Sequence, residues 1–155
     1  MRRGLASAAL VACAGAVVAL AVHFSARLPD GPVAVDWDGV ACAHCGMLVS
    51  DPAFAAQLQL EDGSVRNYDD PGCLLRDLAD PGLPPVHATW LHHHREDRWL
   101  PLEHSAFERV DHSPMGYGLA AVAAGELAGA IPLDAARRLV RAEGDSARSS
   151  SRVAR

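Results

Sequence analysis

The chain has 155 residues, of which 50% are hydrophobic and 21% charged, and this length suits one ordinary domain with an appendage. Between positions 36 and 142 it carries eight Arg, no Lys and sixteen Asp or Glu, so this segment has a net charge of −8. An acidic surface of this kind repels phosphate backbones, which argues against a nucleic acid as partner.

Residues 1–26 are typical of a membrane-targeting segment. Arg2 and Arg3 precede an uncharged run, Leu5 to Phe24, that has the length of one bilayer-spanning helix. A cleaved signal peptide, a lipoprotein acylated at Cys13 and an uncleaved anchor are the alternatives, and the anchor fits the full run best. In each case the two arginines stay in the cytoplasm, so the domain is expected on the extracytoplasmic (periplasmic) side of the membrane.

A spacer with Pro and Gly, residues 27–35, leads into the motif Cys42-Ala43-His44-Cys45-Gly46-Met47. Two thiols, an imidazole and a thioether thus lie within six residues. Such donors suit a thiophilic metal ion, Cu(I) or Zn(II), and copper is our prediction. Exported thiols tend to form disulfides unless a metal or a reducing system holds them, so this pair requires an explanation.

Residues 54–68 predict a β-hairpin. Apolar and polar residues alternate from Phe54 to Glu61, which is the pattern of a half-buried strand. Asp62-Gly63 then predicts a two-residue turn, after which the return strand places Val65 opposite Leu60.

A short helix is expected next, from Pro71 to about Ala79, because an aspartate able to cap it precedes the proline. Cys73 lies in its first turn, where a helix N-terminus lowers the pKa of a thiol. The sequence leaves open whether Cys73 is a metal ligand or a small buried core residue.

Residues 86–91 predict a strand, and another begins near Trp99. We interpret the histidine run between them, His92 to His94, as a solvated turn. Successive side chains of an extended chain point to opposite faces, so these imidazoles do not form one closed metal site.

The second stretch of interest is His112-Ser113-Pro114-Met115-Gly116-Tyr117-Gly118. Apart from the initiator, its methionine and Met47 are the only two in the chain. Beyond it, residues 119–124 predict a central strand and residues 134–141 a capped helix, whereas the Ser- and Arg-rich residues 143–155 predict a disordered tail.

Other classes of protein share the Cys-x-x-Cys spacing. Attachment of c-type haem is excluded because position 46 is Gly and not His. A thiol-disulfide redox protein using Cys42 and Cys45 remains an alternative, and so does a structural zinc module that Cys73 and His112 would complete. No Ser/His/Asp order, phosphate loop or carboxylate pair indicates an enzyme.

Five short motifs follow one another between about residues 40 and 124. They are Cys42-x-x-Cys45-Gly46-Met47, Ser50-Asp51-Pro52-Ala53-Phe54-Ala55-Ala56-Gln57, Asp62-Gly63, Tyr68-Asp69-Asp70-Pro71-Gly72-Cys73 and Ser113-Pro114-Met115-Gly116-Tyr117-Gly118. In this order and with these gaps, they resemble the NosL family of copper chaperones.

The resemblance implies a membrane-tethered extracytoplasmic protein that binds Cu(I). Such a protein would deliver copper to apo nitrous oxide reductase, a denitrification enzyme, or to its membrane assembly machinery. Carried over by position, the implied copper ligands are Cys42, Cys45, Met47 and Met115. Cys73, His44 and His112 are further candidates because they are thiol and imidazole donors within or beside these motifs.

The resemblance also implies the fold. We expect an α+β metal-binding domain over residues 36–142, with small antiparallel sheets and short helices arranged as two ββαβ units. Residues 125–129 leave little room for a helix, so the second unit is expected to be reduced.

Overall fold

The computed structural model describes residue 15 and residues 28–153. The predicted anchor, residues 1–26, lies outside the described residues apart from Gly15, and so does Cys13. The chain divides into two units, Met1–Asp30 and Gly31–Arg155. The second unit contains every strand of the part that the structure describes.

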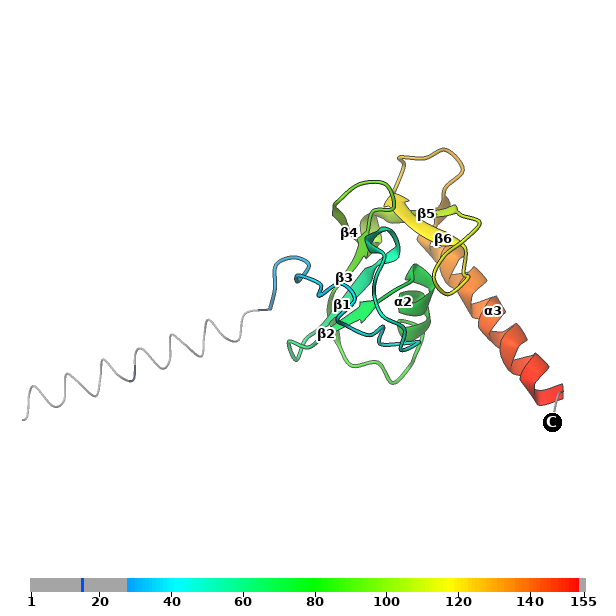
Figure 1. Cartoon of the computed structure of the whole chain (residues 1–155), viewed down its shortest axis with the longest axis horizontal. Helices are drawn as coiled ribbons and strands as arrows, with labels where there is room; N and C mark the ends of the chain where they lie inside the picture. The colour runs from blue at the N-terminus through cyan, green and yellow to red at the C-terminus, as the bar shows by residue number, and fades with distance from the viewer. Residues whose placement is uncertain (1–14, 16–27, 154–155) are drawn as a thin grey trace, which may run out of the picture. The chain divides into compact units, whose positions relative to one another are not determined.

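Four antiparallel strands form the first sheet, in the order β2-β1-β3-β4 (Figure 1). They are β1 (Ala56–Leu60), β2 (Val65–Tyr68), β3 (Val86–His92) and β4 (Trp99–Pro101). A short 3₁₀ helix, η1 (Pro52–Phe54), leads into β1.

Three antiparallel strands form the second sheet, in the order β6-β5-β7. They are β5 (Ser105–Arg109), β6 (Leu119–Ala123) and β7 (Ile131–Pro132), and η2 (Leu102–His104) precedes β5. The predicted strand at 119–124 therefore forms, but at the edge of its sheet and not at the centre. A backbone hydrogen bond of 2.8 Å, from His94 N–H to the Ala121 carbonyl, links it to the chain that leaves β3.

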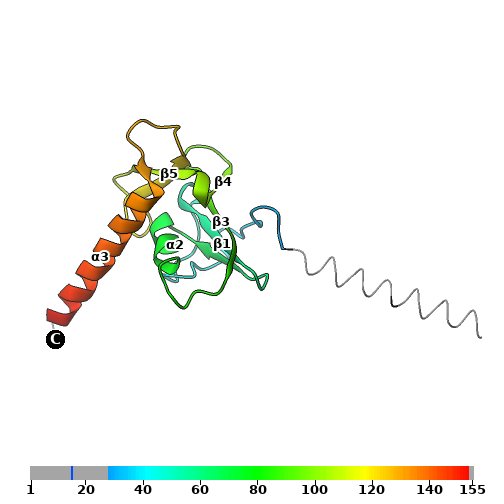
Figure 2. The same ribbon diagram turned by 180° about the vertical axis from the view of Figure 1, so that it is seen from behind.

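Two helices of the described residues complete the fold, α2 (Pro71–Asp77) and α3 (Leu133–Val153). They pack on one another, and α2 also contacts strands of both sheets (Figures 1 and 2). Side chains from both sheets and both helices share one core, including Leu58, Leu74, Phe107 and Val140. The α+β class with small antiparallel sheets is thus confirmed.

Helix α3 is longer than predicted. It was expected over residues 134–141, with a disordered tail from residue 143, but its backbone remains helical to Val153. The segment 143–153 contains one glycine and no proline, so no residue in it removes a donor from the intrahelical hydrogen bonds.

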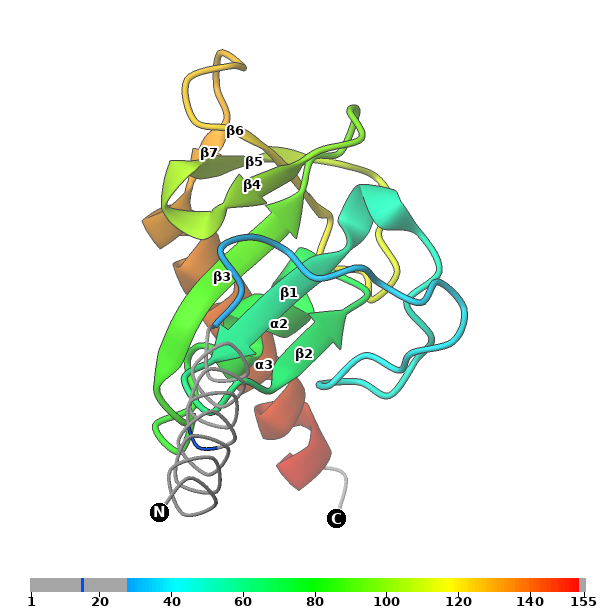
Figure 3. The same cartoon turned by 90° about the vertical axis from the view of Figure 1, so that its left-hand side faces the viewer.

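Strand β1 is buried on both faces, which corrects the expected half-buried pattern. The relative exposures of Gln57 and Gln59 are 0% and 1%. Gln57 exchanges hydrogen bonds with both backbone polar groups of Val33, and the Gln59 amide donates to the Gly31 carbonyl at 2.7 Å. The segment from Gly31 to Val33 therefore crosses one face of the sheet at β1 (Figure 3), and the polar residues of the alternation satisfy its backbone.

The hairpin register also differs from the prediction. Leu60 N–H donates to the Ser64 carbonyl at 2.9 Å, and Val65 pairs with Gln59 and not with Leu60. The connection thus has three residues rather than two, and Gly63 takes the left-handed position in it with φ +85°.

The histidine run is not a solvated turn. Strand β3 extends to His92, and the relative exposures of His92 and His93 are 5% and 1%. His92 N–H donates to the Ala55 carbonyl, so the strand continues to pair where the sequence suggested a loop. The prediction failed because chain segments distant in sequence cover this end of the strand.

Candidate metal centre

The Cys-x-x-Cys loop is a tight turn closed by its own backbone. Cys42 N–H donates to the Met47 carbonyl at 2.7 Å, and Gly46 N–H donates to the Cys42 carbonyl at 3.0 Å. Gly46 has φ +79°, a left-handed conformation that glycine adopts without a steric cost. A further bond, from Ala43 N–H to the Asn67 carbonyl at 2.9 Å, fixes the loop to β2.

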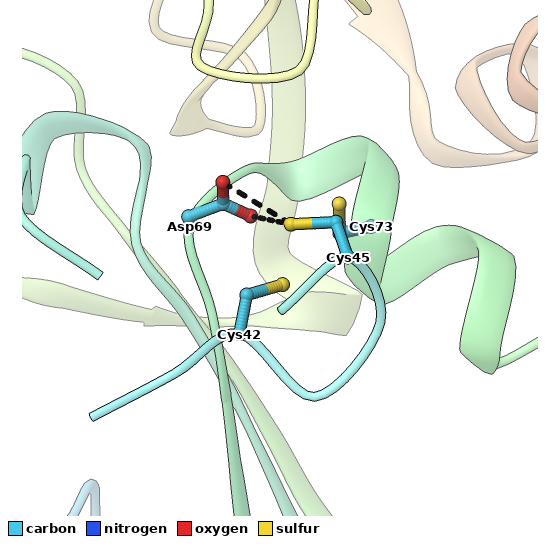
Figure 4. A group of neighbouring side chains, drawn as sticks. All are labelled: Cys42, Cys45, Asp69 and Cys73. Atoms are coloured by element: carbon cyan, nitrogen blue, oxygen red, sulfur yellow. Dashed lines mark hydrogen bonds between the residues drawn. The ribbon is translucent and has the colours of Figure 1, made fainter. Parts of the chain in front are cut away.

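Three cysteines and one aspartate converge beside this loop. One ligand atom from each of Cys42, Cys45, Asp69 and Cys73 lies within 4.8 Å of all the others. Figure 4 shows the side chains turned toward one another, with Cys73 supplied by α2. All three thiols are free. The group can hold a metal ion.

Burial divides the centre into an inner and an outer side. Cys42, Cys73 and Asp69 are buried, with relative exposures of 3%, 0% and 3%, whereas Cys45 is half-buried. The Cys45 thiol lies 3.3 and 3.4 Å from the two carboxylate oxygens of Asp69, to which it donates. Access from solvent is therefore on the Cys45 side.

The thiols differ in how readily they lose a proton. A hydrogen bond from the Cys73 thiol lowers the pKa of Cys42 to about 6, against the opposing effect of burial. The same hydrogen bond raises the pKa of Cys73, with burial adding to it, and burial raises the pKa of Cys45 to about 11. Cys42 is thus the thiol of this centre that loses its proton most readily, and a thiophilic metal would displace the protons of the other two.

The sequence left the role of Cys73 open and missed Asp69. Of two successive aspartates after β2, only Asp70 caps α2, accepting from Gly72 N–H at 2.8 Å. Asp69 is not needed as a cap for α2, because Asp70 already fills that role. The presence of a second aspartate beside the cap was therefore the one signal in the sequence that Asp69 has another function. The helix cap brings Cys73 to the first turn, so cap and thiol are positioned together.

The second motif lies against the N-terminus of α2. Met115 N–H donates to the other carboxylate oxygen of Asp70 at 3.0 Å. The Tyr117 ring lies so close to Gly72 that an added Cβ there would be 2.1 Å from a ring carbon. Two independent contacts therefore bring the loop that contains Met115 to the helix turn that contains Cys73.

Both predicted thioether ligands are exposed. The relative exposure is 50% for Met47 and 39% for Met115. The backbone of each methionine is nevertheless held by a hydrogen bond. The Met47 carbonyl accepts from Cys42 N–H, and Met115 N–H donates to Asp70.

The two candidate histidines lie outside the thiol group. His44 Nδ1 is 2.7 Å from Asp77 Oδ1, and the other oxygen of Asp77 accepts from the Tyr68 hydroxyl at 2.9 Å. His44 is therefore held toward the C-terminal end of α2. His112 is exposed at the start of the second motif.

Comparisons with protein-family models, with curated proteins and with solved structures found no match for the chain. Among residues 28–153, no helix is long and apolar enough to cross a membrane.

Proposed function

We propose that the protein is a Cu(I) carrier, anchored on the extracytoplasmic side of a membrane, which delivers copper for the assembly of a copper enzyme. The observation that carries this proposal is the convergence of three free thiols from two separate elements at a partly exposed point. Cu(I) prefers sulfur donors at low coordination number, and Cys42, Cys45 and Cys73 supply up to three.

The accessibility of the centre suits ligand exchange. Cys45 and the two methionine side chains are reachable from solvent, whereas Cys42 and Cys73 are buried. An incoming donor from a partner would replace the outer sulfurs first and the inner ones last. Copper could then pass between proteins without being released to water.

The NosL resemblance supports nitrous oxide reductase, or its assembly machinery, as the recipient. The element order β1-β2-α2-β3 agrees with the ββαβ unit that the resemblance implies. The second half, β5-β6-β7-α3, has no helix between β6 and β7 in the described residues, in keeping with a reduced second unit. The contact between Asp70 and Met115 supports a role for both motifs in one site.

The test is a Cu(I) competition titration of the full chain under reducing, anaerobic conditions. We expect one tightly bound Cu(I), weakened in Cys42→Ser/Cys45→Ser and in Met115→Leu. Cys13→Ser is the matched control for the thiol changes, because this cysteine lies in the predicted anchor. If Cu(I) fails to bind, or binds equally to all variants, the proposal is wrong and the redox potential of the dithiol becomes the next measurement.

Zinc is the second candidate, and Asp69 is the observation that favours it. Three thiolates and one carboxylate make the four-ligand set of a structural zinc site, whereas Cu(I) has little affinity for carboxylate oxygen. A direct competition separates the two metals. A carrier retains Cu(I) in the presence of excess Zn²⁺, and a zinc module unfolds when a chelator removes Zn²⁺.

A further inference from the structure

A groove lies between α2 and α3, next to the loop that contains the metal-binding cysteines. Its volume is about 610 Å³, and residues of the second half of α2, of the turn after it and of one face of α3 line it. His44 also lines it, which places one edge of the groove at the Cys-x-x-Cys loop. The two helices that form its walls lie side by side in Figures 1 and 2.

Three arginines line this groove, Arg76 from α2 and Arg137 and Arg141 from α3. They make up three of the eight arginines of residues 36–142, a segment with a net charge of −8. Positive charge is thus concentrated at one place on an otherwise acidic surface.

Two carboxylates, Asp77 and Asp80, also line the groove, so its lining has a net charge of +1 within a segment whose net charge is −8. Asp77 is engaged with His44, Tyr68 and Arg66, and Asp80 accepts from Gly82 N–H. Arg137 pairs with Asp134 at 3.5 Å, a contact on the surface of its own helix. In the described part of the chain, Arg76 and Arg141 have no carboxylate within ion-pair distance.

The position of Arg76 is built into the neighbouring helix. A Cβ added at Gly144 of α3 would lie 1.2 Å from Arg76 Nη1, so this guanidinium crosses α3 at a residue without a side chain. Glycine inside a helix costs about 1 kcal/mol relative to alanine. Here it leaves room for a cation at the wall of the groove.

We infer that the groove is a docking site for a carboxylate-rich segment of the protein that receives the metal. Charge complementarity selects the occupant, because the planar guanidinium groups of arginine bind carboxylates with two parallel hydrogen bonds. The inference rests on the proposed function, since an acceptor segment held in the groove would lie beside His44 and the Cys-x-x-Cys loop. Docking there would bring the acceptor's own ligands to the exposed side of the metal centre.

The test uses a fluorescently labelled oligoglutamate peptide as the acidic probe and the full chain as the protein. Fluorescence anisotropy is expected to show binding that weakens with salt, since contacts between exposed charges are screened within about 10 Å at 0.1 M ionic strength. Arg76→Glu/Arg141→Glu is expected to abolish binding. Arg138→Glu is the matched control, because Arg138 is exposed on the same helix but does not line the groove.

Gly144→Ala provides a second variant without any change of charge. Its methyl group should displace the Arg76 guanidinium and weaken peptide binding about fivefold, which corresponds to about 1 kcal/mol, while alanine favours the helix itself. The inference is overturned if the wild-type chain does not bind the peptide, or if the groove variants and Arg138→Glu bind it equally. Preference for anionic lipid vesicles over the peptide would also overturn it.

A Cu(I) titration of the same variants separates this inference from the proposed function. The groove variants should bind Cu(I) as the wild type does, because none of them changes a thiol or a thioether. If the chain binds the peptide in the groove but not Cu(I), the carrier proposal fails and the acidic-segment site stands without it.

Discussion

Two clusters of possible metal ligands have similar spacing. One is the thiol centre, formed by Cys42, Cys45, Asp69 and Cys73, and the other is formed by His93, Glu96 and Glu126. In each of them, atoms able to bind a metal lie within 4.8 Å of one another. The hydrogen bonds distinguish them. Arg95 N–H donates to His93 Nδ1 at 3.1 Å, so the neutral ring carries its proton on Nε2 and donates it to Glu126 at 3.0 Å.

His93 therefore has no free lone pair for a metal, and both carboxylates are paired with an arginine. Arg98 contacts both Glu96 and Glu126, and Ala123 N–H donates to Glu126 at 3.1 Å. The hydrogen bond from His93 lowers the pKa of Glu126, because it stabilises the ionised carboxylate. The comparison teaches that proximity of ligand atoms makes a candidate site only where those atoms retain electrons to donate.

The largest effect is expected for Cys73→Ser. This cysteine enters the thiol centre from α2, so its loss should reveal whether the helix takes part in binding. We expect Cu(I) affinity to fall roughly 100-fold, the upper end of what changes around metal ligands cause. The measurement is the competition titration, with folding checked by circular dichroism. Unchanged affinity would reduce the centre to the Cys-x-x-Cys loop alone.

His93→Gln should lower the stability of the fold and leave Cu(I) affinity unchanged. The side chain of His93 is fully buried, so a replacement that cannot satisfy both Arg95 N–H and Glu126 should lower the free energy of unfolding by about 1–3 kcal/mol. Cu(I) affinity should stay at the wild-type value. Urea unfolding and the Cu(I) titration measure the two quantities. A loss of metal binding with little change in stability would show that His93 is a metal ligand.

Asp70→Ser examines the connection between the two motifs. Serine retains a cap for α2 but is too short to reach Met115 N–H as well. Loss of that hydrogen bond should cost about 1 kcal/mol of stability. If Met115 is a ligand, Cu(I) affinity should also fall about fivefold.

The Asp70→Ser and Met115→Leu effects on Cu(I) affinity should then be less than additive, because both act on one ligand. Asp51→Ser is the matched control, since Asp51 caps η1 through Ala53 N–H. Full additivity would mean that Asp70 supports the helix only.

The sequence was informative wherever the signal was local. The cap at Asp70, the proline at the first helical position and the strand before Asp62-Gly63 all appear in the structure, because each depends on neighbours in the chain. The Cys-x-x-Cys loop was recognised for the same reason. Cys73 was recognised as a candidate but could not be assigned.

The errors concern contacts between distant segments. Gln57 and Gln59 are buried because the chain near Gly31 and Val33 covers them, and nothing in the alternating pattern of β1 reveals this. His93 is buried for a similar reason, by its contact with Glu126. Asp69 was missed because its contact is with Cys45, a residue of the distant Cys-x-x-Cys loop, and the second aspartate beside the helix cap was the one local signal.

The smallest effect is expected for His44→Gln. His44 was a candidate ligand because it lies between the two cysteines of the motif, but its Nδ1 is held by Asp77 at 2.7 Å and it lies outside the thiol group. A partly exposed contact of this kind contributes up to about 1 kcal/mol, so Cu(I) affinity should change less than about fivefold. The Cu(I) competition titration measures this affinity, and His112→Gln serves as a comparison in which another exposed histidine is replaced. A large loss for His44→Gln alone would mean that the imidazole leaves Asp77 to bind copper, and that the loop rearranges when the metal enters.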